Sequence, residues 1–225
     1  MKDTPQHSNK STQRFYSKMY AEFGPSPQGL GWGTKGLQAL RFEALSRVWD
    51  FDERVILDVG CGICDLYEFV EPRGIKRYIG IDFVDAYCEF ARGRFSGPKF
   101  EVINRDLFSS QNLPLCDIAL ASGTFNVMDF ESEDENYSAI DSVMNRLRAA
   151  CRVGFSVNFL SDATTFRDKS LFYAKSERIL SIARRVSRRI LISHFEFPFE
   201  YTIHVWCDES FETSSSLYCD LWPPK

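Results

Sequence analysis

The sequence contains no apolar run long enough to cross a membrane, although 44% of its 225 residues are hydrophobic. A membrane-spanning helix needs roughly 20 consecutive apolar residues, and the polar opening MKDTPQHSNK lacks the apolar segment of a secretory signal. We therefore expect no membrane association and a cytoplasmic location. The sequence also has no excess of basic residues. Its formal net charge of -4 argues against a chain whose main task is to neutralise nucleic-acid phosphates.

A complete set of metal ligands is also missing. Cys61 and Cys64 form a C-x-x-C, but no second pair of suitable spacing follows, so a zinc or redox site lacks its confirming context. The seven cysteines are an odd number scattered through apolar segments, which is typical of reduced thiols. We expect no metal and no disulfide.

The remaining pattern alternates strands and helices after an N-terminal helical part. Apolar residues recur with helical period over residues 11–23 and 37–49. From Val55 onward, strands are predicted at 55–59, 77–82, 99–104, 116–122 and 151–159, and helices from about 65, over 85–94, over 137–149 and around 170–184.

The last two apolar segments, 189–197 and 201–206, are joined by a link too short for a parallel return, so these strands pair antiparallel. The other strands are separated by helical crossovers, which build a parallel sheet covered on both faces. We predict a doubly wound α/β fold with a mostly parallel, seven-stranded sheet and an antiparallel C-terminal hairpin strand.

The stretch VILDVGCGICDL at 55–66 is a strand that runs into a glycine turn. In a dinucleotide site such a turn and the following helix bind a pyrophosphate. Asp65 stands where that helix begins, and two like charges in contact cost on the order of 4 kcal/mol at an effective dielectric constant near 20. NAD and FAD are therefore disfavoured.

S-adenosylmethionine carries an adenosine and a cationic amino-acid arm but no phosphate, so Asp58 and Asp65 would favour it. Its ribose requires a carboxylate at the end of the second strand. Asp82 ends that strand, twenty positions after Gly62 (82 minus 62).

With these motifs the chain resembles the class I S-adenosylmethionine-dependent methyltransferases over residues 37–206. The matching segments are LDVGCG, IGIDF, NRDLF and CDIALASGTFN. The resemblance implies S-adenosyl-L-methionine as cofactor and S-adenosyl-L-homocysteine as product. It also implies the cofactor contacts: Asp58, Gly60, Cys61 and Gly62 along the methionine arm, Asp82 at the ribose, Phe83 over the adenine, Asp106 and Leu107 at its edge, and Ser122 beside the methyl group.

Each of these pieces has an ordinary alternative when it is taken alone. Asp82 is also compatible with a helix N-cap and Asp106 with a turn, but all the motifs fall at the carboxyl ends of strands, where open α/β sheets bind ligands. The third glycine of the family's G-x-G-x-G pattern is Cys64 here, which predicts an altered turn geometry or cofactor affinity.

The domain boundaries follow from this pattern. We expect N-terminal helices and a lid loop at 1–50, the cofactor-binding Rossmann-like domain at 51–207, and a tail at 208–225. Trp32 stands between glycines in the loop, where it would cover the pocket or plug the sheet. Arg41, on the helix behind the loop, is expected to be solvated unless it binds an acidic group of the substrate.

Catalytic residues are less defined, because a base is needed only for some methyl acceptors. His194 and His204 in the terminal hairpin and Asn126 are the candidates, and the alternative for each histidine is a plain sheet position. Phe125 and Asn126 would contact the acceptor or form a tight turn with a buried aromatic ring. The segment lacks both the Asn/Asp-Pro-Pro-aromatic run and the Pro-Cys nucleophile, which argues against DNA-base methylation.

The sequence thus predicts an S-adenosylmethionine-dependent methyltransferase that methylates an oxygen or nitrogen of a small molecule. One alternative is an RNA or protein methyltransferase that uses the basic cluster Arg184, Arg185, Arg188 and Arg189. Another is a non-catalytic scaffold with the same fold.

Overall fold

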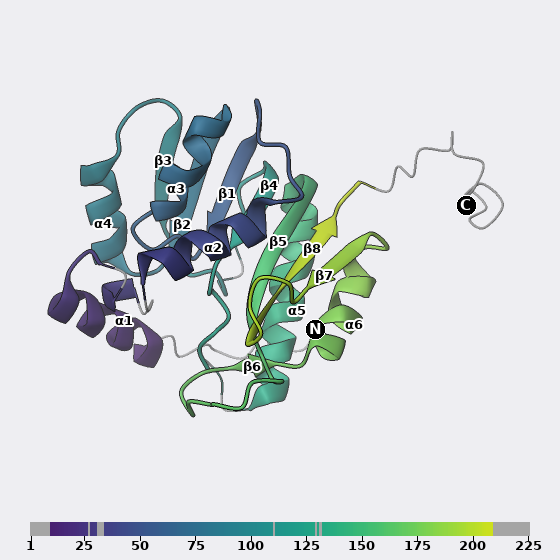
Figure 1. Cartoon of the computed structure of the whole chain (residues 1–225). Coiled ribbons are helices and arrows are strands. Elements are labelled where there is room, and N and C mark those ends of the chain that lie inside the picture. The colour runs from purple at the N-terminus through teal and green to yellow at the C-terminus, as the bar shows by residue number, and fades with distance from the viewer. Residues whose placement is uncertain are drawn as a thin grey trace, which may run out of the picture.

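The computed structural model of the chain (Figure 1) describes residues 10–26, 28–30, 34–109, 111–128, 130 and 132–208. The predicted lid residue Trp32 and the tail beyond Asp208 lie outside these residues. None of the helices within the described residues is both long and apolar enough to span a membrane.

The strands form one sheet in the order β3-β2-β1-β4-β5-β8-β7, with the short β6 paired to the end of β5. Neighbours from β3 to β5 are parallel, whereas β8 runs antiparallel to both β5 and β7. The predicted doubly wound sheet with its antiparallel hairpin strand is therefore confirmed. The strands are β1 (Val55–Val59), β2 (Arg77–Asp82), β3 (Phe100–Asn104), β4 (Cys116–Ala121), β5 (Cys151–Ser161), β6 (Tyr173–Ala174), β7 (Ile190–Ser193) and β8 (Glu200–Trp206).

Helices cover both faces of this sheet, as Figure 1 shows, with α2 crossing one face and α5 and α6 on the other. Two separate apolar cores result, one on each side of the strands. The helical elements are α1 (Lys10–Phe23), η1 (Gln28–Leu30), α2 (Lys35–Ser46), α3 (Asp65–Val70), η2 (Glu71–Arg73), α4 (Asp85–Arg94), α5 (Glu133–Ala150) and α6 (Ser176–Val186).

Side-chain caps set the starts of two helices that the apolar period places too late. The Thr34 hydroxyl accepts a hydrogen bond from the Leu37 N–H, so α2 begins at Lys35. The Ser132 hydroxyl accepts one from the Glu135 N–H, and acidic residues fill the first turn of α5, where they favour the positive end of the helix dipole.

Two further predicted boundaries, in the C-terminal part of the chain, are also wrong. The helix expected around 170–184 begins only at Ser176, because residues 173–174 pair with the end of β5 as β6. The strand expected over 189–197 stops at Ser193, before the turn that leads into β8. Long-range backbone pairing and a turn decide these boundaries, and neither leaves a clear signal in the local apolar pattern.

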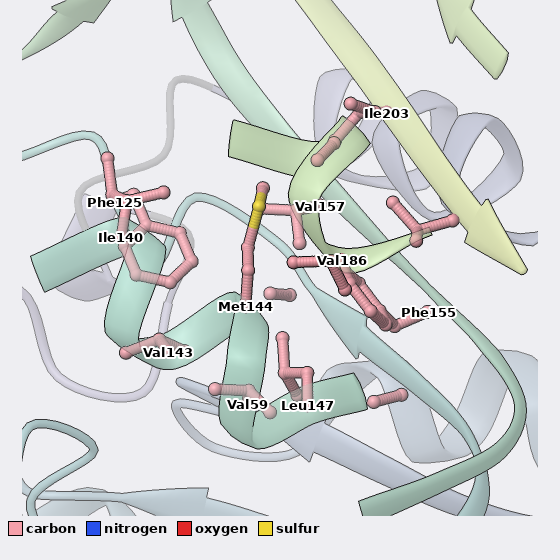
Figure 2. Packing of buried hydrophobic residues seen from close by; sticks show 14 of the residues in the cluster. Val59, Phe125, Ile140, Val143, Met144, Leu147, Phe155, Val157, Val186 and Ile203 are labelled. Carbon is pink, nitrogen blue, oxygen red and sulfur yellow. The ribbon is translucent and has the colours of Figure 1, made fainter. Parts of the chain in front are cut away.

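The core between α5, α6 and the sheet is densely packed. In Figure 2, Met144 and Leu147 of α5 point toward Phe155 and Val157 of β5. Ile203 of β8 belongs to the same cluster of buried residues. Phe155 and Val157 are fully buried. This layer packs beneath the strands whose carboxyl ends form the functional site.

Truncation of a ring in this core should lower stability strongly. We expect Phe155→Ala to reduce the free energy of unfolding by about 3–5 kcal/mol, since it removes a buried ring and leaves a cavity. Phe166, which is 80% exposed, supplies the control: Phe166→Ala should change stability by less than about 0.5 kcal/mol. Urea unfolding of both variants measures this, and equal effects would contradict the packing described here.

Candidate cofactor and active site

A pocket of about 670 Å³, including the space open to solvent, lies at the carboxyl ends of β1, β2 and β4. Residues of α1, η1 and α2 cover it from the other side. Six of the nine predicted cofactor residues line it: Asp58, Gly60, Cys61, Gly62, Asp82 and Ser122.

The turn after β1 requires a left-handed backbone at three alternate positions. Gly60 and Gly62 have φ of 70° and 54°, and Cys64 has φ of 62°. A Cβ on Gly60 would lie 2.7 Å from the Thr124 hydroxyl, which itself donates to the Val59 carbonyl. A side chain at position 60 would therefore clash with Thr124, which explains the glycine there. Cys64, by contrast, adopts a backbone conformation that is strained for a residue with a side chain.

Asp82 joins this turn to the end of β2. Its carboxylate accepts a hydrogen bond from the Gly62 N–H at 2.8 Å and another from the Val84 N–H at 2.9 Å. The N–H groups of Gly60 and Cys61 donate to the Ile81 carbonyl. The N–H groups that would bind a pyrophosphate in a dinucleotide site are thus already used within the protein.

Asp58 is the second buried acid of the pocket, and it accepts a hydrogen bond from the Tyr78 hydroxyl at 2.5 Å. Burial raises the pKa of Asp58 to about 7, with a further increase from the neighbouring Asp82 and Asp65 charges. Burial also raises the pKa of Asp82 to about 6, against the effect of its backbone hydrogen bonds. Neither carboxylate has an ion-pair partner in the described part of the chain.

The sequence predicts that an unpaired Asp65 carboxylate would repel a phosphate, but in the structure this carboxylate is paired. It forms an ion pair with Arg94 and accepts a hydrogen bond from the Gln38 side chain at 3.1 Å. Arg94 offsets part of this charge, since the same guanidinium also pairs with Glu68. Asp58 and Asp82 add two buried acids to the pocket.

The roof over the pocket contains residues that the sequence reasoning missed. Tyr16 of α1 and Leu30 of η1 line the pocket, and the Tyr87 hydroxyl of α4 donates to the Gly29 carbonyl at 2.7 Å. The pattern of α1 gives Phe15 and Phe23 as part of the apolar face, but both are about half exposed. Docking of α1 against α4 decides which aromatic side chains turn inward, and one helix alone carries no signal for it.

Three predicted adenine contacts lie outside the pocket lining. Phe83 packs in a small apolar cluster with Tyr87 and Leu30. Asp106 accepts a hydrogen bond from the Phe108 N–H, which is the turn alternative, and Leu107 is buried in the core. Their contacts with the cofactor stay predictions.

Phe125 and Asn126, the predicted contacts of the methyl acceptor after β4, contact other parts of the protein instead. Phe125 is buried and stacks on Phe159 with ring centroids 5.8 Å apart. The Asn126 side-chain oxygen accepts a hydrogen bond from the Leu160 N–H at 3.2 Å. Neither residue belongs to the pocket lining.

Neither histidine candidate lies at the pocket. His204 has no exposed surface, is hydrogen-bonded to Ser156 at 2.7 Å, and has a pKa lowered to about 4 by burial and the Arg47 charge. An acceptor cannot reach it, so the structure favours the plain sheet position. His194 is exposed and packs against the Tyr201 ring.

Arg41 corrects another expectation, because it is buried rather than solvated. It forms an ion pair with Glu200, with side-chain exposures of 9% and 2% respectively, and its guanidinium lies over the Phe197 ring.

Cys61 and Cys64 are buried free thiols. Across the described residues, no group of three or more acidic, histidine or cysteine side chains is arranged to hold a metal.

The comparisons with known proteins agree with this geometry. Rv1506c of Mycobacterium tuberculosis (strain ATCC 25618 / H37Rv), provisionally named a methyltransferase, is 34% identical over 156 residues, which are 67% of this chain and 91% of that protein. No protein-family model matches the chain.

Solved structures share the fold at low sequence identity. A SAM-dependent methyltransferase of Leishmania major is similar with a TM-score of 0.68 and 12% identity, over 88% of this chain and 82% of that chain. Magnesium protoporphyrin IX methyltransferase of Synechocystis PCC 6803, with bound SAH, gives 0.58 and 11%, over 89% and 94%. The fold is that of the class I S-adenosylmethionine-dependent methyltransferases, and the chain belongs to the methyltransferase family of its mycobacterial relative.

The strained cysteine leads to a test of the turn. We expect Cys64→Gly to be more stable than Cys64→Ala by about 1 kcal/mol, since both remove the thiol but only glycine relieves the left-handed backbone. The same pair at Cys61, whose φ is not positive, should have the opposite order. Thermal unfolding of the four variants measures this, and an alanine advantage at Cys64 would contradict the strain.

The two buried acids give a pH dependence. Since the folded chain holds protons on Asp58 up to a pKa of about 7, the ligand-free protein should lose stability as pH rises from about 4 to 7. Asp58→Asn should remove the Asp58 part of this loss and stabilise the ligand-free protein at pH 8 by up to about 4 kcal/mol, since each pKa unit between about 4 and about 7 corresponds to about 1.4 kcal/mol. Urea unfolding at pH 5 and pH 8 measures it.

The exposed Asp134 supplies the control, because Asp134→Asn should leave the difference between the two pH values unchanged. A wild-type minus Asp58→Asn difference that is independent of pH would show that Asp58 is ionised like an ordinary carboxyl group.

Proposed function

We propose that this methyltransferase binds S-adenosyl-L-methionine in the described pocket and methylates an oxygen or nitrogen of a small molecule. The observation that carries the cofactor assignment is the pair of buried carboxylates, Asp58 and Asp82, which have no cationic partner among the described residues. Burying a charge without a partner is costly. A ligand with a cationic arm and two ribose hydroxyls satisfies both groups.

The pocket residues fit this cofactor in a further respect. The Ser122 hydroxyl is buried at the pocket and has no hydrogen-bond partner among the described residues, so a polar ligand atom in the pocket would satisfy it. Asp58 and the Gly60–Gly62 turn would hold the amino-acid arm, and Asp82 the ribose. Bound S-adenosylmethionine supplies a methyl group on a positively charged sulfonium, with S-adenosyl-L-homocysteine left as product.

The contribution of the protein is alignment and exclusion of water. Ser122 and Thr124 line the pocket at the end of β4, and Phe42 and Gln38 line it from α2. No titratable group beyond the acids of the cofactor site is needed, since in-line displacement at a neutral amine or an ionised oxygen proceeds without a protein base.

The roof supports a small acceptor. Leu30 lies so close to the glycine turn that a Cβ on Gly62 would be 3.0 Å from one of its methyl carbons. Leu30 and Tyr16 both line the pocket. The basic cluster of the rival proposal is partly neutralised, because Arg185 pairs with Asp141 and Arg189 with Asp208.

Calorimetry tests the cofactor assignment. Wild-type protein should bind S-adenosylmethionine and S-adenosylhomocysteine but not NADH, and Asp82→Ala should weaken binding at least about 100-fold, because it removes a charged hydrogen-bonding partner. Asp134→Ala, on the exposed face of α5, should bind normally. Absence of binding to the wild type would favour the scaffold alternative.

The acceptor requires a separate experiment. Transfer of tritiated methyl groups to a metabolite extract, total RNA and a protein lysate should label chiefly the metabolite fraction. Label that appears mainly in RNA or protein would overturn the small-molecule assignment and leave the cofactor assignment intact.

A further inference from the structure

A chain of buried polar contacts runs from α2 across the end of the sheet to the pocket. Arg41 of α2 donates to both carboxylate oxygens of Glu200, through its Nε at 2.7 Å and through its Nη2. The Asn158 amide donates to the same carboxylate at 3.2 Å. The Asn158 oxygen accepts a hydrogen bond from the Gly123 N–H at 2.6 Å.

The two ends of this chain lie beside residues of two different walls of the cofactor pocket. Gln38 and Phe42, which flank Arg41 on α2, line one wall. Gly123, which has a left-handed φ of 69°, lines the other wall together with Ser122 and Thr124. Glu200 itself does not line the pocket, yet its carboxylate is bonded toward both walls.

We propose that Glu200 is a positioning residue for the methyl-donor site, because it fixes α2 through Arg41 and the Ser122–Thr124 segment through Asn158. This inference rests on the proposed binding of S-adenosylmethionine in the pocket. The arrangement holds the roof helix and the β4 turn at a set separation, and small displacements of such walls reduce the binding of a ligand that contacts both.

Stability alone is a poor reason for such a pair. Desolvation of two buried charges often outweighs their attraction, and apolar residues of similar volume frequently give an equal or higher stability. Loss of one partner is different, because the remaining buried charge is then uncompensated. Stability and positioning can therefore be separated by experiment.

The test compares single and double variants at this pair. Arg41→Met and Glu200→Met should each lower stability, and the double variant should recover it to near the wild-type value, since no buried charge remains. If the pair positions the walls, the double variant should still bind S-adenosylmethionine about tenfold more weakly than wild type, because Asn158 has lost its acceptor. Urea unfolding and calorimetry measure the two properties.

The matched control is a second ion pair that links the end of α2 to the same hairpin, Arg47 with Glu196. Its double methionine variant should bind the cofactor within about twofold of wild type, because it has no contact with Asn158. Asn158→Leu keeps the Arg41–Glu200 pair and removes the two hydrogen bonds of the Asn158 side chain, to Glu200 and from Gly123. It should reproduce the weaker binding.

Recovery of both stability and affinity in the double methionine variant would overturn the positioning role, as would normal affinity in Asn158→Leu. Either result leaves the proposed function standing, provided that wild-type protein binds the cofactor. A wild-type protein that binds no S-adenosylmethionine would contradict both proposals.

Discussion

The hydrogen bond from the Gly62 N–H to the Asp82 carboxylate links the turn after β1 to the end of β2. Both residues line the pocket, so this hydrogen bond, which we call the joint, sets the position of two of its walls. The parallel register of β1 and β2 brings Val59 opposite Ile81, so the two strand ends emerge side by side. Left-handed backbone at Gly60 and Gly62 then lets the chain turn back toward Asp82. One carboxylate thereby shapes the loop and leaves an acidic surface for a ligand.

The same joint explains why the pocket does not suit a dinucleotide. The sequence suggests that Asp65 repels a pyrophosphate, but in the structure Arg94, which also pairs with Glu68, offsets part of that charge. The effective reason is that the turn's N–H groups already donate to Asp82 and to the Ile81 carbonyl. Choice of cofactor thus follows from hydrogen bonds that are satisfied internally, and the nearby charge of Asp58 reinforces it. Such buried acids lower the stability of the ligand-free protein in return for binding a cation.

The sequence is informative about the part of the site that comes from strand ends. Asp58, Asp82 and Ser122 follow apolar strands, and parallel strands deliver their carboxyl ends to one edge, so their proximity could be predicted. Tyr16, Leu30 and Gln38 could not, because they reach the pocket only through the docking of helices on the sheet. Helical period identifies the apolar face of a helix but not the part of the protein against which that face packs.

Arg41 shows the same limit at longer range. A lone arginine on a predicted helix is expected in solvent, and its partner Glu200 stands 159 positions later in the chain. Register places Glu200 beside Leu160 at the start of β8, where α2 crosses the sheet. Only the complete strand order, with β8 inserted between β5 and β7, brings the two charges together.

The walls of the pocket are consequently held by bonds of different kinds. Backbone ladders fix the strand ends that carry Asp58, Asp82 and Ser122. Side-chain contacts hold the roof: Gln38 to Asp65, Arg41 to Glu200, and Tyr87 to the Gly29 carbonyl. Segments attached in this way open at a lower free energy than the central strands. Under the proposed function, the strand ends held by backbone ladders would bind the charged nucleoside, and the roof held by side-chain contacts would open to admit ligands.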